Sequence, residues 1–312
     1  MNDRKSVAGG AVVAPSRRAR SGRRLRSPHE AATGIAFVSP AILLLLIFFV
    51  VPIFFNLYIS FTNYTPGTPA KFIGLRNYST AARSSTFKHA LAHTLIFAVA
   101  TTIASAALGF TIACVLNQIR GRSFRFYRLA FYLPGLTSVS VSALLWLYLY
   151  DPQVGILNRL LVAVHLPPQQ WLQDPHLALA CIIAMAVWMS LGFSMLVYLG
   201  GLQNIPHEIV DAARVDGAGA LTRAIRIIAP MLRPVTLFVS VVLFIQSMQV
   251  FSEVYIMTNG GPLDSTNTSV LEIYKTAFTD GEFGLAAAMS FVMFAMLVVL
   301  GLLGSLARRR SD

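Results

Sequence analysis

The chain has 312 residues, of which 55% are hydrophobic and only 12% are charged. Soluble globular proteins carry about 25% charged residues, so this composition excludes an ordinary soluble domain. The net charge of +12 could suggest nucleic acid, but here the basic residues flank apolar runs, as the positive-inside rule of membrane proteins requires. The two cysteines, Cys114 and Cys181, lie inside uncharged runs and are expected to be packing residues, not a disulfide or a metal site.

Uncharged runs dominate the chain. Six stretches lack Asp, Glu, Lys and Arg: 31–70, 89–119, 129–150, 175–207, 234–252 and 283–307. Each can hold the roughly 20 apolar residues that cross a bilayer of about 30 Å, and backbone groups in lipid must be bonded within their own segment. The fold class is therefore an all-α integral membrane protein with six transmembrane helices in a domain over 31–307. The spans are predicted near 34–58, 91–116, 129–150, 177–199, 235–257 and 283–306.

Both ends of the chain are basic. Residues 1–30 combine eight Lys and Arg with Gly, Ala, Ser and Pro, which predicts a disordered cytoplasmic tail. A signal peptide is the competing interpretation, but the apolar run that follows is too long and no small-x-small cleavage site comes after it. Residues 308–312 form a short second tail.

The distribution of Lys and Arg predicts the orientation. The two tails and the loops 117–128 and 200–234 carry 19 of these residues, against 6 in the other three loops. The positive-inside rule therefore places both termini in the cytoplasm, and it places the loops 62–88, 151–176 and 258–282 outside. Within 151–176, the apolar residues 160–166 are expected to form a short interfacial helix.

Several kinds of chemistry are missing from the sequence. No Gly-Lys pair occurs, so there is no GxxxxGK[ST] phosphate loop, and neither HExxH nor GxSxG is present. No catalytic residue and no metal site is predicted. Scattered histidines are expected to be interfacial polar residues rather than metal ligands; they are His29, His89, His93, His165, His176 and His207. Glu253 is the one acid predicted inside the membrane, whereas a secondary carrier usually needs several buried ionisable groups.

A polar segment, 204–234, lies between two predicted spans. Asp211-Ala212-Ala213 is followed after three residues by Gly217, and Ile227 and Pro230 come further on. Residues 208–215 favour a helix that stops at Gly217, and 218–228 restart an amphipathic helix that Pro230 and Pro234 are expected to end. The alternative interpretation is an ordinary amphipathic connecting loop.

This spacing resembles the EAA loop of ABC importer permeases, with Asp211 in place of the family's Glu and Ala229 in place of its Leu. FIGLRNY at 72–78, the segment 133–158 and TNGGP at 258–262 are also similar to carbohydrate-type permeases. The resemblance covers about residues 30–307. It implies a maltose-permease-like fold in a bacterial plasma (inner) membrane.

The resemblance also implies partners. These are a second, homologous permease subunit, two cytoplasmic ABC ATPase subunits that bind ATP and Mg, and an extracellular or periplasmic solute-binding protein. Membrane lipid surrounds the chain, no cofactor is expected in it, and nucleic acid is not a partner. The residues expected to couple the chain to the ATPase are Glu208, Asp211, Ala212, Ala213, Asp216, Gly217, Ile227 and Pro230.

Polar residues inside spans are candidates for solute contact. Gln246, Gln249 and Glu253 fall within about 60° of one another if the fifth span is one helix, and their amides and carboxylate suit sugar hydroxyls. Tyr255 is nearby in sequence, and Trp188 and Ser194 in the fourth span are weaker candidates, beside Ser190 and Tyr198. The alternative is polar contact between helices.

The resemblance implies an ATP-driven, binding-protein-dependent importer subunit that moves a mono- or oligosaccharide by alternating access. A glycerol-phosphate-type solute is the runner-up, although no Lys or Arg inside a span could pair a phosphate. A secondary carrier and a membrane-embedded enzyme are the other classes. Coupling charges with internal repeats would favour the first of these, and clustered catalytic residues would favour the second.

Overall fold

The computed structural model describes residues 28–119 and 121–309. Of the predicted tails, residues 1–27 and 310–312 therefore lie outside the described part. Within it the regular segments are helices, and the sheet pairing consists of one isolated bridge between Thr62 and Phe72. The chain divides into two units, residues 1–54 and 55–312, and each is described by itself.

The first long helix runs through α1 (Pro28–Leu45), the π turn η1 (Leu46–Val50) and α2 (Val51–Ser60). Its candidate membrane span, Ala36–Ser60, is 25 residues long. From residue 36 to 54 the side chains are exposed apart from half-buried Val50, and most of them are Leu, Ile, Val and Phe. Such an apolar surface suits contact with hydrocarbon, so this segment agrees with the predicted span 34–58.

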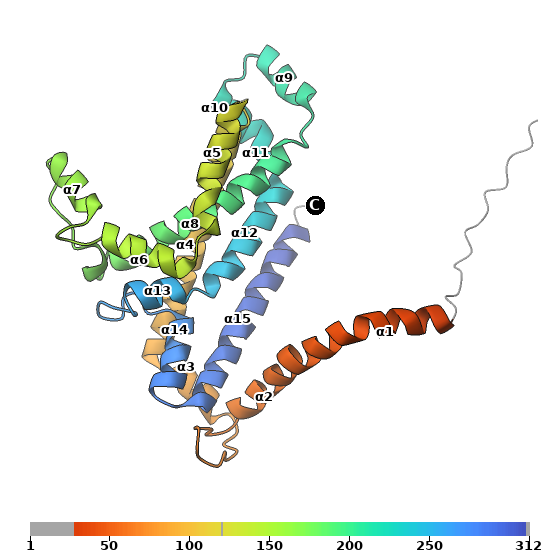
Figure 1. The fold of residues 1–312 in the computed structure, drawn as a ribbon, viewed down its shortest axis with the longest axis vertical. Helices are drawn as coiled ribbons and strands as arrows, with labels where there is room; N and C mark the ends of the chain where they lie inside the picture. The colour runs from red at the N-terminus through yellow and green to blue at the C-terminus, as the bar shows by residue number, and fades with distance from the viewer. Residues whose placement is uncertain (1–27, 120, 310–312) are drawn as a thin grey trace, which may run out of the picture. The chain divides into compact units, whose positions relative to one another are not determined.

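Three helices form the centre of the second unit (Figure 1). They are α4 (Ser85–Leu116), α8 (Ala178–Leu202) and α12 (Arg233–Met248), and α4 packs against both of the others. One core cluster combines buried Ala113, Met195, Tyr198 and Leu243 from these helices. Helices α4 and α8 lie in close contact at Gly109, where a Cβ would collide with the side chain and backbone of Ser194. Small residues at such crossings let membrane helices pack closely.

The predicted third span, 129–150, is not one helix. The chain forms α5 (Arg122–Tyr132) and a 3-10 turn η2 (Leu133–Leu136), then bends by 100° into α6 (Val139–Leu149). Pro134 lacks the N–H that an α-helix needs there, and the backbone at Thr137 and Ser138 is extended. The sequence LPGLTS therefore breaks the span into two arms.

The predicted fifth span, 235–257, is also interrupted. Helix α12 ends at Met248, Gln249 leaves the helical conformation, and α13 (Ser252–Met257) begins after a short break. Gln249 donates its side-chain N–H to the carbonyl of Ile245, which helps to close the end of α12. Four described helices are long and apolar enough to cross a membrane. Up to six spans result if each of two bent pairs counts as one span, namely Arg122–Leu136 with Val139–Leu149 and Ala220–Met231 with Arg233–Met248.

Short helices cover the expected external end of this unit. They are α3 (Arg76–Arg83), α7 (Ile156–Ala163), η3 (Trp171–Gln173), α14 (Ser269–Tyr274) and the π turn η5 (Lys275–Thr279). Helix α7 overlaps the short helix expected over 160–166 only at 160–163, since it begins at Ile156 and ends at Ala163. The last helix, α15 (Phe283–Arg309), packs against α3, and buried Asn77 joins them to the chain after α2 by donating to the carbonyls of Ser60 and Thr62.

Candidate functional site

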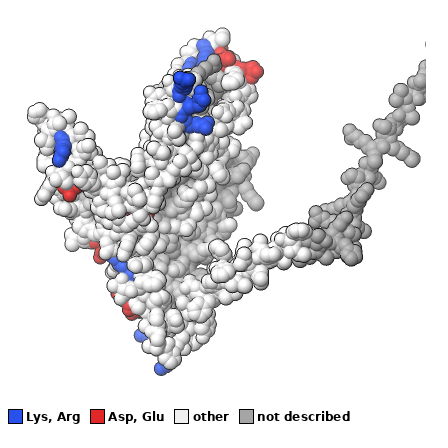
Figure 2. Space-filling view, in the orientation of Figure 1, with Lys and Arg blue, Asp and Glu red and all other residues white. Residues whose placement is uncertain are grey.

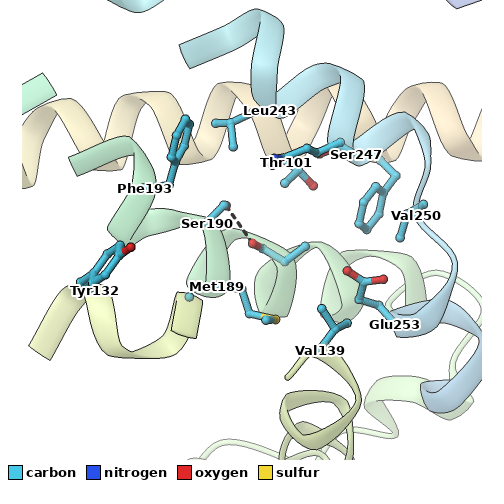
Figure 3. A pocket seen from close by; sticks show the side chains of 14 residues that line it. Thr101, Tyr132, Val139, Met189, Ser190, Phe193, Leu243, Ser247, Val250 and Glu253 are labelled. Carbon is cyan, nitrogen blue, oxygen red and sulfur yellow. Dashed lines mark hydrogen bonds between the residues drawn. The ribbon is translucent and has the colours of Figure 1, made fainter. Parts of the chain in front are cut away.

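A cavity of about 360 Å³ lies among α4, α8, α12 and the broken ends of two spans. Figure 3 shows its labelled side chains around one space, with Tyr132 and Glu253 at opposite ends. The lining residues are Phe97, Thr101, Tyr132, Gly135, Val139, Ala186, Met189, Ser190, Phe193, Leu243, Gln246, Ser247, Val250 and Glu253. A cavity of this size falls in the usual range for small-molecule sites, about 300–1,000 Å³.

Helix breaks and a glycine create this space. The bend after η2 brings Gly135 and Val139 to the wall, and the end of α12 brings Val250 and Glu253. Gly192 lets α8 approach α5, because a Cβ there would lie 2.7 Å from Tyr132 Cα and 2.8 Å from the carbonyl oxygen of Phe131. The cavity thus depends on irregular backbone at two helix breaks, where Gly135 is exposed and Val250 is buried.

The polar groups of the cavity are mostly neutral. Ser190 Oγ lies 2.7 Å from Ser105 Oγ and also donates to the carbonyl of Ala186 at 2.8 Å. Thr101 is only 2% exposed, and its hydroxyl has no hydrogen-bond partner among the described residues. Glu253 adds a carboxylate that forms no ion pair, since the salt bridge found in the described part joins Asp211 and Arg214. The lining therefore offers hydroxyls, an amide and a carboxylate.

Two of the six residues predicted for the solute pathway line this cavity: Gln246 and Glu253. Gln249 does not line the cavity. Helix α12 ends at Met248, so the rotation of about 100° per residue that would place Gln249 beside Gln246 no longer applies at Gln249. Tyr255 is partly exposed and stacks on Phe251, with ring centroids 5.3 Å apart.

Neither candidate from the fourth span, Trp188 or Ser194, lines this cavity. Trp188 makes an edge contact with Trp146 at 5.8 Å, and buried Ser194 donates to the carbonyl of Ser190 where α8 meets α4. Sequence reasoning missed three polar lining residues: Thr101, Tyr132 and Ser247. Each lies in or near a predicted span, and a systematic search for hydroxyl groups inside spans would have found them.

The polar segment 204–234 begins with α9 (His207–Val215). Asp216 caps it, and Gly217 follows with φ +75, a left-handed conformation that favours glycine. The N–H of Ala218 donates to the carbonyl of Ala213 at 2.9 Å, which closes the helix end. The predicted helix over 208–215 and its stop at Gly217 are therefore present in the structure.

The second arm of the segment differs from the prediction at its end. It runs through α10 (Ala220–Arg223), the π turn η4 (Ala224–Ile228) and α11 (Ala229–Met231), and it then bends by 76° into α12. Pro230 was expected to end this helix but lies inside it. The preceding π turn, in which the Ala229 N–H donates to the carbonyl of Ala224, widens the backbone where proline would otherwise clash. Pro234 stands in the first turn of α12, a position that tolerates proline.

Large apolar side chains are exposed on both arms. The exposed fractions are 88% for Val215, 73% for Leu221 and 58% for Ile225. Figure 2 shows acidic groups over α9 and basic groups grouped beside them over the end that carries α5 and α10. Among the predicted coupling residues, Glu208, Asp211, Ala212, Asp216, Gly217 and Pro230 are exposed, Ile227 is half-buried and Ala213 is buried. The segment thus exposes both apolar and charged side chains.

Known proteins are similar to this chain in sequence and in fold. The arabinooligosaccharides transport system permease protein AraP of Bacillus subtilis is 30% identical over 93% of this chain and 92% of its own length. The lactose transport system permease protein LacF of Rhizobium radiobacter is 34% identical over 88% of this chain and 94% of its own. A chain from the crystal structure of a bacterial ABC transporter involved in the import of the acidic polysaccharide alginate superposes with a TM-score of 0.79 over 90% of this chain and 96% of that one, at 22% identity.

A protein-family description also matches most of the chain. Residues 105–312 match the description "Binding-protein-dependent transport system inner membrane component". The match covers the whole polar segment and the cavity lining from Tyr132 onward, but not Phe97 and Thr101 of α4. The relatives extend the likeness to nearly the entire chain. The chain is therefore a multi-pass membrane protein that belongs to the family of binding-protein-dependent ABC transporter permeases.

Proposed function

We propose that this permease subunit carries a carbohydrate, a mono- or oligosaccharide, through the cavity between α4, α8 and α12. The observation that carries this proposal is the set of neutral hydroxyl and amide groups around a space of about 360 Å³. The names of AraP and LacF, both transport system permeases for sugars, support it. Among the described residues, no Lys or Arg lines the cavity, which disfavours a phosphate-bearing solute such as glycerol phosphate.

Specific side chains in the cavity suit sugar hydroxyls. The unpartnered hydroxyl of Thr101 can bind one, and a buried polar group without a partner costs about 1–3 kcal/mol until something satisfies it. Gln246 offers both a donor and an acceptor, and Glu253 offers acceptors. We propose Thr101, Ser190, Gln246 and Glu253 as solute-contact residues.

The segment 204–234 is proposed to couple the chain to ATPase subunits. Its two rigid arms meet at Gly217, and the exposed Val215 and Leu221 give it an apolar surface that a partner could cover. The proposed assembly holds a second permease, two cytoplasmic ATPase subunits that bind ATP and Mg, and an external solute-binding protein. Closure of the ATPase pair would then bias the permeases between an outward and an inward state, which is alternating access.

Transport with defined sugars tests the solute class. The complete importer, with its cognate binding protein in proteoliposomes, is expected to accumulate at least one of lactose, maltose or arabinotriose when ATP is present inside. Glycerol 3-phosphate serves as the competing solute. Uptake of glycerol 3-phosphate in the absence of any sugar uptake would overturn the carbohydrate assignment.

The cavity residues can be tested in the same system. Thr101→Val keeps the shape of the side chain and removes its hydroxyl, and Gln246→Leu removes the amide. Each is expected to raise the KM for sugar uptake about 5- to 150-fold, because a buried solute group left without its hydrogen-bond partner costs about 1–3 kcal/mol. Gln249→Leu is the matched control, since Gln249 is close in sequence but does not line the cavity. An unchanged KM in both cavity variants would contradict the proposed pathway.

The energy source can be tested on the isolated chain. Because the sequence has no phosphate-binding loop, the purified chain is expected to hydrolyse no ATP above the rate of empty lipid vesicles. The measurement is phosphate release, with the assembled complex as the positive control. Hydrolysis by the chain alone would exclude its proposed role as a subunit driven by partner ATPases.

A further inference from the structure

A second, polar pocket of about 400 Å³ lies at the expected external end of α4, apart from the cavity described above. It joins the first turns of α4 to the loop between α13 and α14. The lining residues are Ser85, Thr86, His89, Ala90, His93, Leu263, Asp264, Ser265 and Asn267. No Lys or Arg is among them, whereas imidazole, carboxylate, amide and hydroxyl groups are.

Two histidines stand four residues apart on α4, in the sequence His89-Ala-Leu-Ala-His93. Side chains at positions i and i+4 of a helix are neighbours, with Cβ atoms about 5–6 Å apart. A helical pair with this spacing can bind one metal ion through both imidazoles. His89 is exposed and His93 is half-buried, so an ion could enter from solvent.

The hydrogen bond of His93 sets its tautomer. Its Nδ1 lies 3.1 Å from the carbonyl oxygen of Asn267. A carbonyl oxygen can only accept, so Nδ1 carries the proton and Nε2 of the neutral ring keeps its lone pair. Histidines that bind metals usually donate their other N–H to a carbonyl or a carboxylate in this way, which orients the ring and strengthens the ligand.

An amide oxygen is the third ligand group. Asn267 is 2% exposed, and its Oδ1 has no hydrogen-bond partner in the described part of the chain. Its Nδ2 donates to Glu272 Oε2 at 2.7 Å, and since a carboxylate oxygen accepts from that amide, the assignment of nitrogen and oxygen follows from the contact. The buried hydroxyl of Ser265 is also without a partner. A bound ion or water is one way to satisfy a buried acceptor that has no protein partner.

We propose that this pocket is a binding site for a divalent transition metal of the Zn²⁺ type, held by His89, Nε2 of His93 and Oδ1 of Asn267, with water completing the coordination. Imidazole suits zinc, copper, iron and nickel, whereas calcium and magnesium prefer all-oxygen sites. Among the described residues no three His, Cys, Asp or Glu side chains converge on one point, so the site depends on the amide oxygen. Asp264 lines the same pocket and contributes negative charge. This proposal revises the expectation that His89 and His93 are only interfacial residues.

Metal binding would join α4 to the loop that carries Asn267. The two elements already meet through the His93 contact and through Thr94 Oγ1, which accepts from the Ser269 N–H at 2.8 Å. An ion at the three proposed ligands would add a link at the external end of the pocket. The proposal does not depend on which solute the importer carries.

Zinc binding by the purified full chain in lipid nanodiscs tests the site. After removal of any histidine tag, bound Zn²⁺ is measured by competition with a chromophoric chelator. The wild-type chain is expected to bind Zn²⁺ at a site that His89→Gln and His93→Gln each weaken at least about tenfold. His176→Gln, which removes another exposed histidine on the expected external side, is the matched control and is expected to bind as the wild type does.

A fourth variant separates a ligand from a purely structural residue. Asn267→Ala removes the proposed ligand oxygen and is expected to weaken Zn²⁺ binding at least about tenfold. Because it also removes the amide donor to Glu272 Oε2, Glu272→Gln, which keeps an acceptor for that donor, is its matched control and is expected to bind Zn²⁺ as the wild type does. The melting temperature of each variant is measured without metal, and it is expected to be unchanged in His89→Gln because that side chain is exposed. Wild-type affinity in both His89→Gln and His93→Gln would overturn the proposal, and wild-type affinity in Asn267→Ala would remove the amide oxygen from the ligand set.

Discussion

Replacement of Gly217 by valine is expected to abolish most ATP-driven uptake while membrane insertion stays normal. Gly217 has φ +75, and a β-branched residue held there would cost about 1–3 kcal/mol of backbone strain. The chain relieves this strain by changing the angle between α9 and α10, the two arms proposed to contact the ATPase. A loss of about 1–3 kcal/mol in the coupling free energy corresponds to a roughly 5- to 150-fold loss of coupled sugar uptake. Sugar uptake and sugar-stimulated ATPase activity of the complete importer measure it.

A conservative variant isolates backbone conformation from side-chain bulk. Asparagine tolerates the left-handed region, and no atom lies within 4 Å of a Cβ built on Gly217, so Gly217→Asn is expected to keep most of the activity. If Gly217→Val transported as well as Gly217→Asn, the proposed coupling role of this turn would be excluded. Equal loss in both variants would point instead to direct contact between the glycine and its partner.

Replacement of Gly192 by alanine is expected to destabilise the second unit, whereas the same change at Gly200 of the same helix should stabilise it slightly. A Cβ at Gly192 would lie 2.7 Å from Tyr132 Cα and 2.8 Å from the Phe131 carbonyl oxygen, and such backbone atoms cannot move aside as a flexible side chain can. Overpacking of this kind costs about 1–3 kcal/mol. Nothing lies within 4 Å of a Cβ at Gly200, so alanine there gains about 0.5–1 kcal/mol of helix propensity.

Thermal unfolding of the purified complex in one detergent measures both changes. The melting temperature is expected to fall in Gly192→Ala and to stay equal or rise in Gly200→Ala. The cavity should change in the first variant only, because Tyr132 lines it and Gly192 sets the distance between α8 and α5. Equal melting temperatures in the two variants would mean that α8 and α5 separate without cost, contrary to their packing here.

Apolar length and glycine position made much of the fold predictable. The predicted spans 91–116 and 177–199 correspond to α4 and α8, since each is a long uncharged run without an internal proline. The spans over 129–150 and 235–257 were not continuous. Pro134 and Gly135 were visible in the sequence, but apolar composition alone does not show whether such a pair bends a helix or breaks it.

The two parts of the candidate site differed in how far they could be predicted. The turn after α9 could be predicted because it needs one residue with positive φ, and a glycine, Gly217, stands at that position in the sequence. The cavity is built by residues far apart in sequence, such as Thr101, Tyr132 and Gln246, which only the packing of three helices brings together. Periodicity within one helix could place Gln246, but it failed for Gln249, since the helix ended there.

The π turns carry a consequence for comparing related chains. Both η1 and η4 end two residues before a proline, Pro52 and Pro230, and each adds one residue to the helical path. One extra residue shifts the register of everything that follows by about 100° around the helix axis. A relative that lacks this proline could therefore delete one residue within 224–228 and keep the same side chains facing α12. A one-residue gap at this point of an alignment would then mean that the π turn is replaced by a regular α-helical turn, while the side chains that face α12 stay the same.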